Sequence, residues 1–470
     1  MVVRTIDMVR RIWPGTLATT VIASLLAGCA PVGPNYRQPQ LPAPAQFRFV
    51  ESAQAASLAD VPWWQVFDDP VLQALVRDAI AGNLDVRAAV ARVERFRAEA
   101  GIAKSLLYPQ VDGAATYTVQ QNSGSADGDV QQNAVYGFQL SWEIDLFGRI
   151  RREREAAIAR MLASEQGRRG VLVTLVGDVA STYFLLRQLD IELDIARRTL
   201  GVNDETVTYF QNRLDGGVSN QLEVDRIRAF RAQTAAAIPD LERQIAIAEN
   251  ALALLLGRVP GPIARERIEA LPLPPPMIPP GLPAALLERR PDVVEAEQLL
   301  TAANADVGAA RALFFPAISL TSFVGGVSGS LATLLGGSGG VWQAAPGLLQ
   351  PVFNGGRLRR NLEAARASYD EALAQYQKAA LNGYREVANA LVTVQKLSDV
   401  YAQQDIGVAA LRDAADLSRA RYNNGLASYI EILTADQDLF EQQLQLAQTG
   451  GAELRARADL YRALGGGWQP

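Results

Sequence analysis

The pattern of apolar and polar positions changes period between residues 136 and 217. At first the two kinds of side chain alternate, which is typical of a strand with one apolar face; that face carries Tyr136, Phe138, Leu140, Trp142 and Ile144. From Arg149 the apolar residues follow steps of three and four, as they do along a packed helix. Asp215-Gly216-Gly217 then allows a chain reversal. The pattern therefore predicts a strand, a helix over 149–213 that is roughly 95 Å long, and a hairpin.

The same order of elements occurs twice. The sequence GRIRRE at 148–153 returns as GRLRRN at 356–361, and RLDGGVSNQLEV at 213–224 returns as RYNNGLASYIEI at 421–432. Both pairs lie 208 residues apart, so we infer an internal duplication. Each copy reads as a helix, two strands, a long helix, a hairpin and a return helix.

The duplication sets the predicted boundaries. The first copy spans 70–256, and it begins with helical sequence from 70 to 107, in which only Gly82 and Gly101 could interrupt the helix, followed by a strand hairpin at 110–146. A proline-rich linker covers 257–283. The second copy spans 284–470, and its expected elements are a helix at about 284–312, strands at about 317–353, a long helix at 357–421 and a return helix at 428–464. The predicted fold class is mainly α with a β-barrel portion.

The predicted strands are about ten residues long, which is enough to cross a bilayer at a tilt. A soluble hairpin with one buried face is the alternative reading. Two hairpins provide too few strands to close a barrel, which takes about eight, and open sheet edges do not occur in lipid. If the strands lie in a membrane, several copies must share one barrel, and a cyclic homo-oligomer is expected.

The first 28 residues are expected to be a lipoprotein signal peptide. Arginines precede a short apolar run, which ends in Leu26-Ala27-Gly28 directly before Cys29. Cleavage at this point would leave Cys29 to carry a covalent lipid, which anchors a chain to a membrane without spanning it. Residues 29–69 are rich in Pro, Ala and Gln, and we expect an extended, poorly ordered leader.

The composition excludes several classes of site. The chain has no His and a single Cys, so it lacks the residues for Ser-His-Asp and Cys-His catalysis and the usual zinc ligands. The net charge of −5 argues against a nucleic-acid partner. A hydrolase with paired carboxylates remains open in principle, but no acidic pair lies in a suitable loop. We therefore expect no enzyme activity, no metal and no cofactor other than the lipid on Cys29.

Several long motifs together carry a resemblance. They are CAPVGPNYRQP, WWQVFDDPVLQALV, WEIDLFGRIRRERE, LLERRPDVVEAEQLLTAANADVGAARALFFPAISL, RYNNGLASYIEIL and LYRALGGGW. With them the chain resembles the TolC-like outer-membrane factor family, in its lipidated efflux branch. The resemblance implies a homotrimer whose subunits each contribute four strands to one transmembrane barrel, continued by a periplasmic α-helical barrel. It also implies a periplasmic adaptor and an inner-membrane pump as partners, in antibiotic or metal efflux.

In proteins of this family the inner hairpin closes the periplasmic end of the tube. The residues at matching or neighbouring positions are Glu431, Ile430, Tyr422, Glu223, Thr434 and Asp436. Two positions depart from the family pattern: Thr434 stands where a second acidic ring is expected, with Asp436 two residues on, and Ala427 stands where a linking arginine is expected. The closed gate is therefore expected to depend more on packing by Ile430 than on charge. The alternative for each polar residue is a solvated helix surface.

The hairpin tips are the expected docking surface for the adaptor. Their residues are Arg213, Asp215, Gly216, Gly217, Arg421, Asn424 and Gly425; the alternative is that they only form turns. The predicted function is a passive, gated outer-membrane exit duct for small toxic compounds. A lipid-anchored helical scaffold without a pore and a protein-secretion duct of the same fold are the rival hypotheses.

Overall fold

The computed structural model of the protein describes residues 31–41, 44, 47, 67–121, 130–268, 270–272, 288–329 and 339–466. The predicted signal peptide and Cys29 lie outside the described residues. The chain divides into two compact units. Unit 1 comprises residues 1–40, 92–165 and 295–377, and unit 2 comprises residues 41–91, 166–294 and 378–470.

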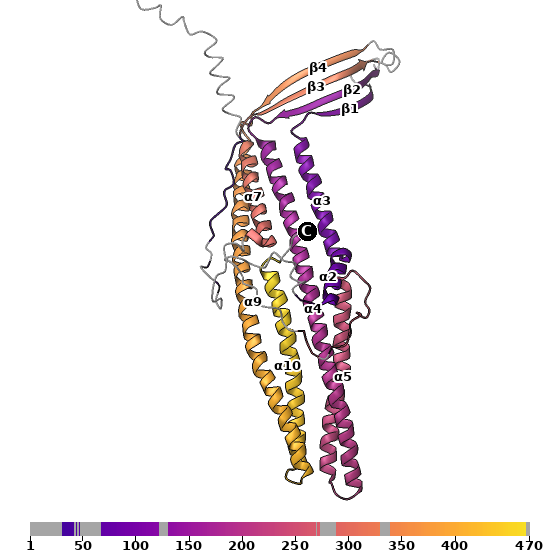
Figure 1. Ribbon diagram of the computed structural model, residues 1–470. Helices are drawn as coiled ribbons and strands as arrows, with labels where there is room; N and C mark the ends of the chain where they lie inside the picture. The colour runs from indigo at the N-terminus through magenta and orange to yellow at the C-terminus, as the bar shows by residue number, and fades with distance from the viewer. Residues whose placement is uncertain are drawn as a thin grey trace, which may run out of the picture. The chain divides into compact units, whose positions relative to one another are not determined.

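Unit 1 carries one antiparallel sheet, in which the strands lie side by side in sequence order (Figure 1). The strands are β1 (Gln110–Gln121), β2 (Val130–Ile144), β3 (Ala317–Ser328) and β4 (Gly340–Leu349). The predicted alternation in β2 leaves Tyr136, Phe138 and Ile144 on the surface, with 46%, 66% and 40% of each exposed. Within the described chain β1 and β4 each pair on one side only. The sheet therefore presents two free edges and an apolar surface.

The fourth strand is shorter than the sequence predicts. It ends at Leu349, whereas we expected strand structure to about residue 353. Pro351 follows directly and cannot donate to a ladder. Pro346 is tolerated inside β4, opposite Leu320, because β4 is an edge strand.

The helices repeat in the two copies. The first copy contains α2 (Pro70–Gly82), α3 (Leu84–Ser105), α4 (Arg149–Asp215) and α5 (Gln221–Leu255), and the second contains α7 (Pro291–Ala312), α9 (Arg357–Asn423) and α10 (Tyr429–Ala463). The two long helices, α4 and α9, have 67 residues each, which corresponds to roughly 100 Å. In unit 2, α5 returns along α4 and α10 returns along α9 (Figure 1). A mainly α fold with one antiparallel sheet confirms the predicted class.

The single helix expected from 70 to 107 is wrong, because the chain breaks at Asn83. The Asn83 side chain accepts hydrogen bonds from the backbone N–H groups of Asp85 (2.8 Å) and Val86 (3.1 Å), and so caps α3. Its Nδ2 donates to the carbonyl of Leu255 at 2.9 Å. The chain therefore forms two helices, α2 and α3, and Asn83 between them also binds the end of α5.

Residues 284–287, where the first helix of the second copy was expected to begin, lie outside the described residues; residues 288 and 289 are helical, and α7 follows after a break at Arg290. It starts at Pro291, where proline suits the first helical position because that N–H is free in any case. The preceding Arg290 is bound by Asp292 and Glu386, each at 2.7 Å, and donates to the carbonyl of Ala463 at 2.8 Å. These bonds fix the start of α7 to the end of α10.

The apolar seam of α4 lies in the core of unit 2. Its residues at steps of three and four are buried, among them Leu172, Leu175, Val179, Tyr183 and Leu186. By length and composition α4 also contains a stretch that could cross a membrane, and half of that stretch is buried in the protein. The ring of Phe184 lies 4.9 Å from the ring of Phe67, centroid to centroid. This stretch is a packed seam.

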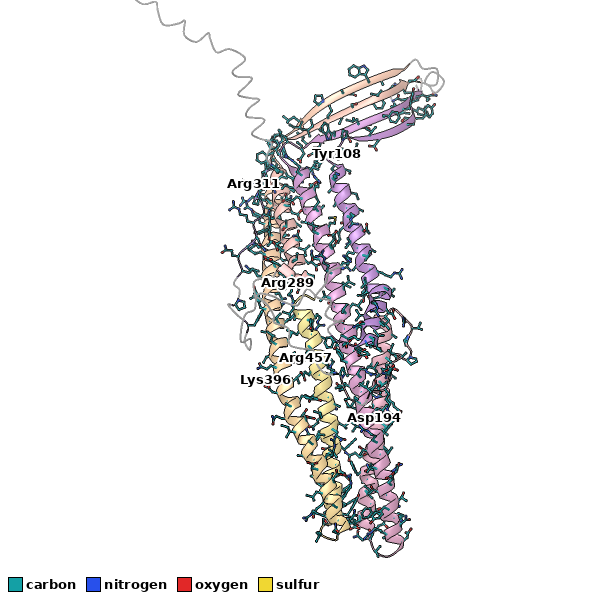
Figure 2. All side chains as sticks on the ribbon, viewed as in Figure 1. Tyr108, Asp194, Arg289, Arg311, Lys396 and Arg457 are labelled. Atoms are coloured by element: carbon teal, nitrogen blue, oxygen red, sulfur yellow. The ribbon has the colours of Figure 1, made fainter. Side chains whose placement is uncertain are left out.

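The described part of the predicted linker is bound to the helices of unit 2, and we call residues 257–268 the strap. Arg265 contacts both carboxylate oxygens of Asp190 on α4 (2.7 and 2.8 Å) and Glu249 on α5 (2.5 Å). Arg267 binds Asp194, which Figure 2 labels on α4. Arg258, in contrast, makes an exposed pair with Asp78 at 2.8 Å. The strap joins α4 to α5 through the buried side chain of Arg265, whereas the side chain of Arg267 is largely exposed.

Residues 31–38 of the predicted leader have defined contacts, which corrects the expectation of a poorly ordered segment for this part; residue 30 and most of residues 42–66 lie outside the described residues. The Val32 N–H donates to the carbonyl of Phe147 at 3.0 Å. The Arg152 guanidinium donates to the carbonyls of Val32 and Gly33 and to Asn35 Oδ1, the last at 2.8 Å. Further along, Tyr36 and Gln38 reach Glu297 at 3.2 and 3.3 Å. In unit 1 the leader therefore lies against α4 and α7.

We expect Gly33→Ala to displace this leader. Gly33 has a φ of +108°, and an added Cβ would lie 2.5 Å from Gly308 Cα, so both backbone strain and a backbone clash oppose it. The loss of stability should be about 1–3 kcal/mol, and limited proteolysis should cut the leader faster. Gly261→Ala is the control, since its φ is ordinary and no atom lies within 4 Å. Equal protease resistance in both variants would show that the leader does not need this close approach.

Candidate functional site

The two helical hairpins meet through a cluster of aromatic rings at their tips. Phe210 on α4 lies 3.9 Å from Tyr429 on α10 and 5.9 Å from Tyr422 on α9, centroid to centroid. Phe210 and Tyr429 are almost fully buried, with 1% and 3% exposed. Burial also raises the pKa of Tyr429 above its ordinary value, so the phenol stays neutral. Aromatic packing thus joins the first copy to the second.

An arginine at the end of each long helix closes its own hairpin. Arg213 donates to the carbonyl of Val218, and Arg421 donates to the carbonyl of Leu426, both at 3.3 Å. The Arg213 guanidinium also lies 5.8 Å from the ring centroid of Tyr422, within reach of a cation–π contact. These two predicted docking residues therefore have a structural role within each turn.

The remaining tip residues form helix caps. Gly217 and Gly425 have φ values of +73° and +70°, the left-handed conformation that glycine adopts at helix ends. Gly216 donates from its backbone to Asn212 at 3.0 Å. Asp215 accepts from Gln211 at 2.9 Å, and Asn424 donates to the carbonyl of Ala420 at 2.8 Å. The turn geometry accounts for these residues, and adaptor docking stays a prediction.

Three of the predicted gate residues are held within the chain. Glu223, in the first turn of α5, accepts from Ser219 Oγ at 2.6 Å. Asp436 accepts from Arg419 Nη2 at 2.6 Å. Tyr422 belongs to the aromatic cluster described above. In a single chain these side chains stabilise the packing of the hairpins.

The other predicted gate residues face outward from the hairpin of the second copy. Ile430 is 42% exposed, Thr434 is exposed, and the carboxylate of Glu431 lies 3.7 Å from Arg421 Nε in an exposed pair. The structure therefore does not bring Ile430 into the aromatic cluster. These three side chains are available for contacts with another molecule.

The pH should affect the packing of the hairpins through Asp436. Burial raises the pKa of this carboxyl above 3.8; the Arg419 cation opposes the rise, and the negative charge of Asp416 adds to it. When folding raises the pKa of a carboxyl, its protonated form favours the folded state. That contribution to the free energy of unfolding is complete below the ordinary pKa and is lost as the pH rises through the raised value. Acidification from pH 7 toward pH 4 should therefore stabilise the packed hairpins, and thermal unfolding measured across this pH range should show it. Asp436→Asn should reduce this pH dependence; an unchanged profile would assign it to other groups.

Sequence reasoning missed Phe210 and Tyr429, the two buried members of the cluster. The available signal was their place on the helices: Phe210 lies one turn before the turn arginine Arg213, and Tyr429 is the first residue of α10. No metal site emerges either, because the described residues contain no cluster of three acids or cysteines that could bind an ion.

Comparisons with known proteins decide the family. Residues 75–258 and 282–466 each match the family described as Outer membrane efflux protein. The chain belongs to this family. The two matched segments start 207 residues apart, close to the spacing of the sequence repeat. The resemblance predicted from the motifs is confirmed.

Relatives of this efflux protein cover nearly its whole length. The cation efflux system protein CusC of Escherichia coli O6:H1 is 33% identical over 97% of this chain and 99% of its own. The probable outer membrane lipoprotein SilC of Salmonella typhimurium is 32% identical over 94% and 97%. The open-state structure of the MtrE outer membrane channel of Neisseria gonorrhoeae superposes with a TM-score of 0.85 at 31% identity, over 93% of this chain and 98% of that one.

Proposed function

We propose that this efflux protein forms the outer-membrane exit duct of a tripartite system. The observation that carries the proposal is the sheet with two free edges and an apolar surface. β1 leaves the helices and β4 returns to them, so β4 of one copy and β1 of the next would pair antiparallel. Four strands per chain are too few for a barrel, and three copies in a ring provide twelve. A homotrimer also gives Ile430, Glu431 and Thr434 a common axis to face.

The same proposal includes a lipid anchor, a periplasmic adaptor and an inner-membrane pump. A covalent lipid on Cys29 would hold the chain to the outer membrane, in agreement with the description of SilC as a lipoprotein. The helical hairpins would extend into the periplasm and contact an adaptor that links them to an inner-membrane pump. The transported compounds would be small toxic molecules or metal ions, since CusC is a cation efflux protein. The chemistry assigned to the chain is transport, with no catalytic step.

The first test is the mass of the purified, lipidated protein together with its single-channel conductance in a planar bilayer. A trimer with a small, mostly closed conductance supports the duct. A monomer that never conducts supports the scaffold. A large, permanently open conductance would point to the protein-secretion duct.

A gate at the second hairpin predicts a leak when Glu431 or Ile430 is changed. We expect Glu431→Ala to raise the conductance of the closed channel by up to about fivefold, because an exposed ion pair contributes no more than about 1 kcal/mol; Ile430→Gly should raise it as well, through the loss of apolar packing at the gate. Glu441→Ala, an exposed glutamate further along α10, should leave the conductance unchanged. If all three variants conduct like the wild type, these residues do not belong to the gate.

A further inference from the structure

The sequences GRIRRE at 148–153 and GRLRRN at 356–361, which we call the two copies of the Gly-Arg motif, follow β2 and β4. They differ in whether their first arginine has an ion-pair partner. In the first copy, Arg149 pairs with Glu143 and Glu153, each at 2.7 Å, and Arg151 pairs with Asp145 at 3.2 Å. In the second copy, the exposed guanidinium of Arg357 has no ion pair or hydrogen bond with the described residues. A cation at the first residue of α9 also opposes the helix dipole. The stability of α9 therefore does not explain Arg357.

The apolar residues of the same two segments differ in the same way. In the first copy, Phe147 is half-buried and its ring stacks on Phe315 at 4.8 Å. In the second copy, Val352 and Phe353 are 93% and 91% exposed. Exposed Leu349, at the base of β4, continues this apolar surface toward the sheet. Fully exposed neighbouring apolar side chains indicate a binding surface.

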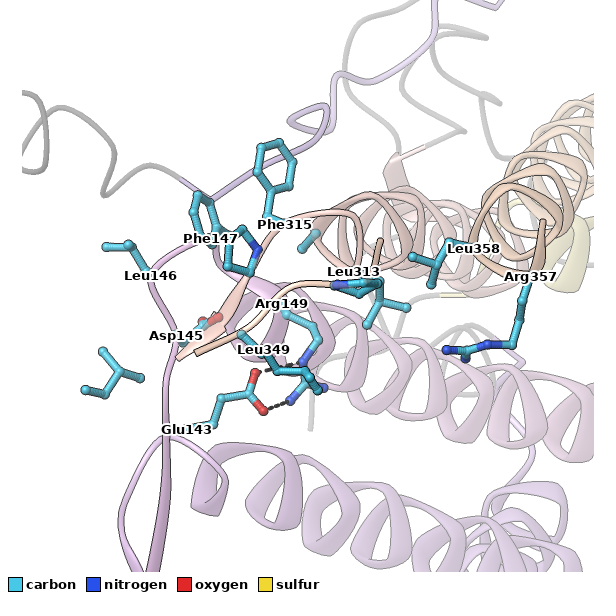
Figure 3. A pocket seen from close by; sticks show the side chains of 15 residues that line it. Glu143, Asp145, Leu146, Phe147, Arg149, Leu313, Phe315, Leu349, Arg357 and Leu358 are labelled. Atoms are coloured by element: carbon cyan, nitrogen blue, oxygen red, sulfur yellow. Dashed lines mark hydrogen bonds and ion pairs between the residues drawn. The ribbon is translucent and has the colours of Figure 1, made fainter. Parts of the chain in front are cut away.

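A cavity of about 250 Å³ opens between these two segments in unit 1. Its walls are mainly apolar, with Leu313, Phe315 and Leu349 among them, and Arg357 lies at its edge. Figure 3 shows Arg149 bound by Glu143, whereas no dashed line reaches Arg357. The cavity has the volume of about eight water molecules, so a polar headgroup could enter it.

Two more cations lie at the same level, where the other helices meet the strands. Lys104 is in the last turn of α3 and Arg311 in the last turn of α7; Figure 2 labels Arg311 at this end of the helix. Both are exposed, and neither pairs with a described carboxylate. Glu363, on the first turns of α9, is already bound by Arg359 and Arg360. The surface therefore changes from apolar on the sheet side to cationic on the helix side.

We propose that this junction surface, formed by Lys104, Arg311, Arg357, Val352 and Phe353, binds anionic phospholipid. The cations would contact the phosphate, and the exposed apolar pair would lie against the acyl chains. This inference rests on the proposed function, in which the sheet lies in the membrane. An apolar band followed by unpaired basic residues is the order of chemistry that a protein meets from the hydrocarbon to the headgroups.

The leader gives an independent marker of the same level. Its residue Pro31 touches Gly148, at the start of the first Gly-Arg motif, closely enough that a Cβ on Gly148 would lie 2.5 Å from Pro31 Cα. The proposed acylated residue, Cys29, is only two residues earlier, and two residues span at most about 7 Å. An acyl chain on Cys29 would thus enter the membrane beside this junction. Free phosphate would not explain the exposed apolar pair, and so a lipid is the better occupant.

The test uses the full-length lipidated protein in detergent, titrated with short-chain phosphatidylglycerol or phosphatidylcholine, with bound lipid counted by native mass spectrometry. The test variant is K104Q/R311Q/R357Q. The control variant, R87Q/K378Q/R412Q, removes the same charges from exposed helix positions in unit 2 that have no ion pair among the described residues. Each basic residue near an anionic surface contributes about a fivefold gain in affinity. Wild type and control should prefer phosphatidylglycerol, and the test variant should lose most of that preference.

Several outcomes would overturn the proposal. They are equal binding of both lipids by the wild type, an unchanged preference in the test variant, and a loss of preference that inorganic phosphate alone reproduces. If the test variant no longer forms trimers, the surface is a contact between subunits, and R357Q alone decides whether lipid preference changes in an intact trimer. Conductance in phosphatidylcholine bilayers is measured in parallel. Pores without any lipid preference would leave the duct standing and reject only this site.

Discussion

Replacing Phe210 with alanine is expected to produce a channel that conducts without an adaptor. The Phe210 ring is 1% exposed and packs against rings from both helices of the second hairpin, α9 and α10. Removing a buried phenylalanine costs about 3–5 kcal/mol, and every 1.4 kcal/mol of that cost changes an equilibrium about tenfold. Because the lost contacts join the two hairpins, the cost falls on the packed, closed arrangement. Single-channel recording in planar bilayers should show a higher open probability.

Phe184→Ala is the matched control for this experiment. Phe184 is also on α4 and is fully buried, but it lies 26 residues before Phe210, or about 39 Å along the helix. Its replacement should lower thermal stability by a similar amount and leave the conductance closed. If both variants leak equally, the leak reflects general destabilisation, and the aromatic cluster does not specifically hold the hairpins in the closed arrangement.

Arg265→Ala is expected to give the largest loss of stability among the charged residues. Its guanidinium lies between Asp190 on α4 and Glu249 on α5, and its side chain is only 13% exposed. Truncation would leave Glu249 poorly solvated and without its cation, and Asp190 with only the longer contact to Arg187 at 3.4 Å. Breaking a buried pair in this way costs about 3–5 kcal/mol, and the thermal midpoint in detergent should fall clearly.

Arg258→Ala on the same strap supplies the control. The Arg258–Asp78 pair is about half exposed on both sides, and such pairs contribute about 0–1 kcal/mol. Its midpoint should therefore stay close to that of the wild type. A large effect of Arg258→Ala, or none of Arg265→Ala, would contradict the view that the strap is held by buried charge.

The elements that local rules control could be predicted from the sequence. The strand alternation in β2, the length of α4 and the glycine turns depend on spacing within a few residues, and the duplication gave the same information twice. Gly82 indicated a possible interruption of the first helix, but the cap by Asn83 could not be predicted, because its side chain is fixed partly by Leu255, distant in sequence. The contacts of the strap and of the leader could not be predicted for the same reason. Proline-rich composition predicts an extended chain, but it does not reveal the carboxylates and carbonyls that the chain meets.

In the candidate site, too, the local features could be predicted and the contacts between distant residues could not. The turn residues of both hairpins were found because glycine and arginine spacing is visible in the sequence. The pairing of Phe210 with Tyr429 is a contact between helices of different copies, and periodicity identifies only the face on which each ring lies. The gate roles of Ile430 and Glu431 stay predictions, since both are exposed in a single chain and a ring of subunits would decide them.

The contacts of the leader with the second copy affect the order in which the chain can fold during its synthesis and export. Gln38 donates to Tyr376, a residue 338 positions later, at 3.5 Å, and Asn304 donates to the carbonyl of Pro34 at 3.0 Å. A chain is made and exported from its N-terminus, so the segment that leaves the ribosome early must wait for residues made much later. The leader can therefore bind Phe147 and Arg152 of the first copy early, but Pro34 and Gln38 reach their contacts with Asn304 and Tyr376 only after the second copy has been delivered.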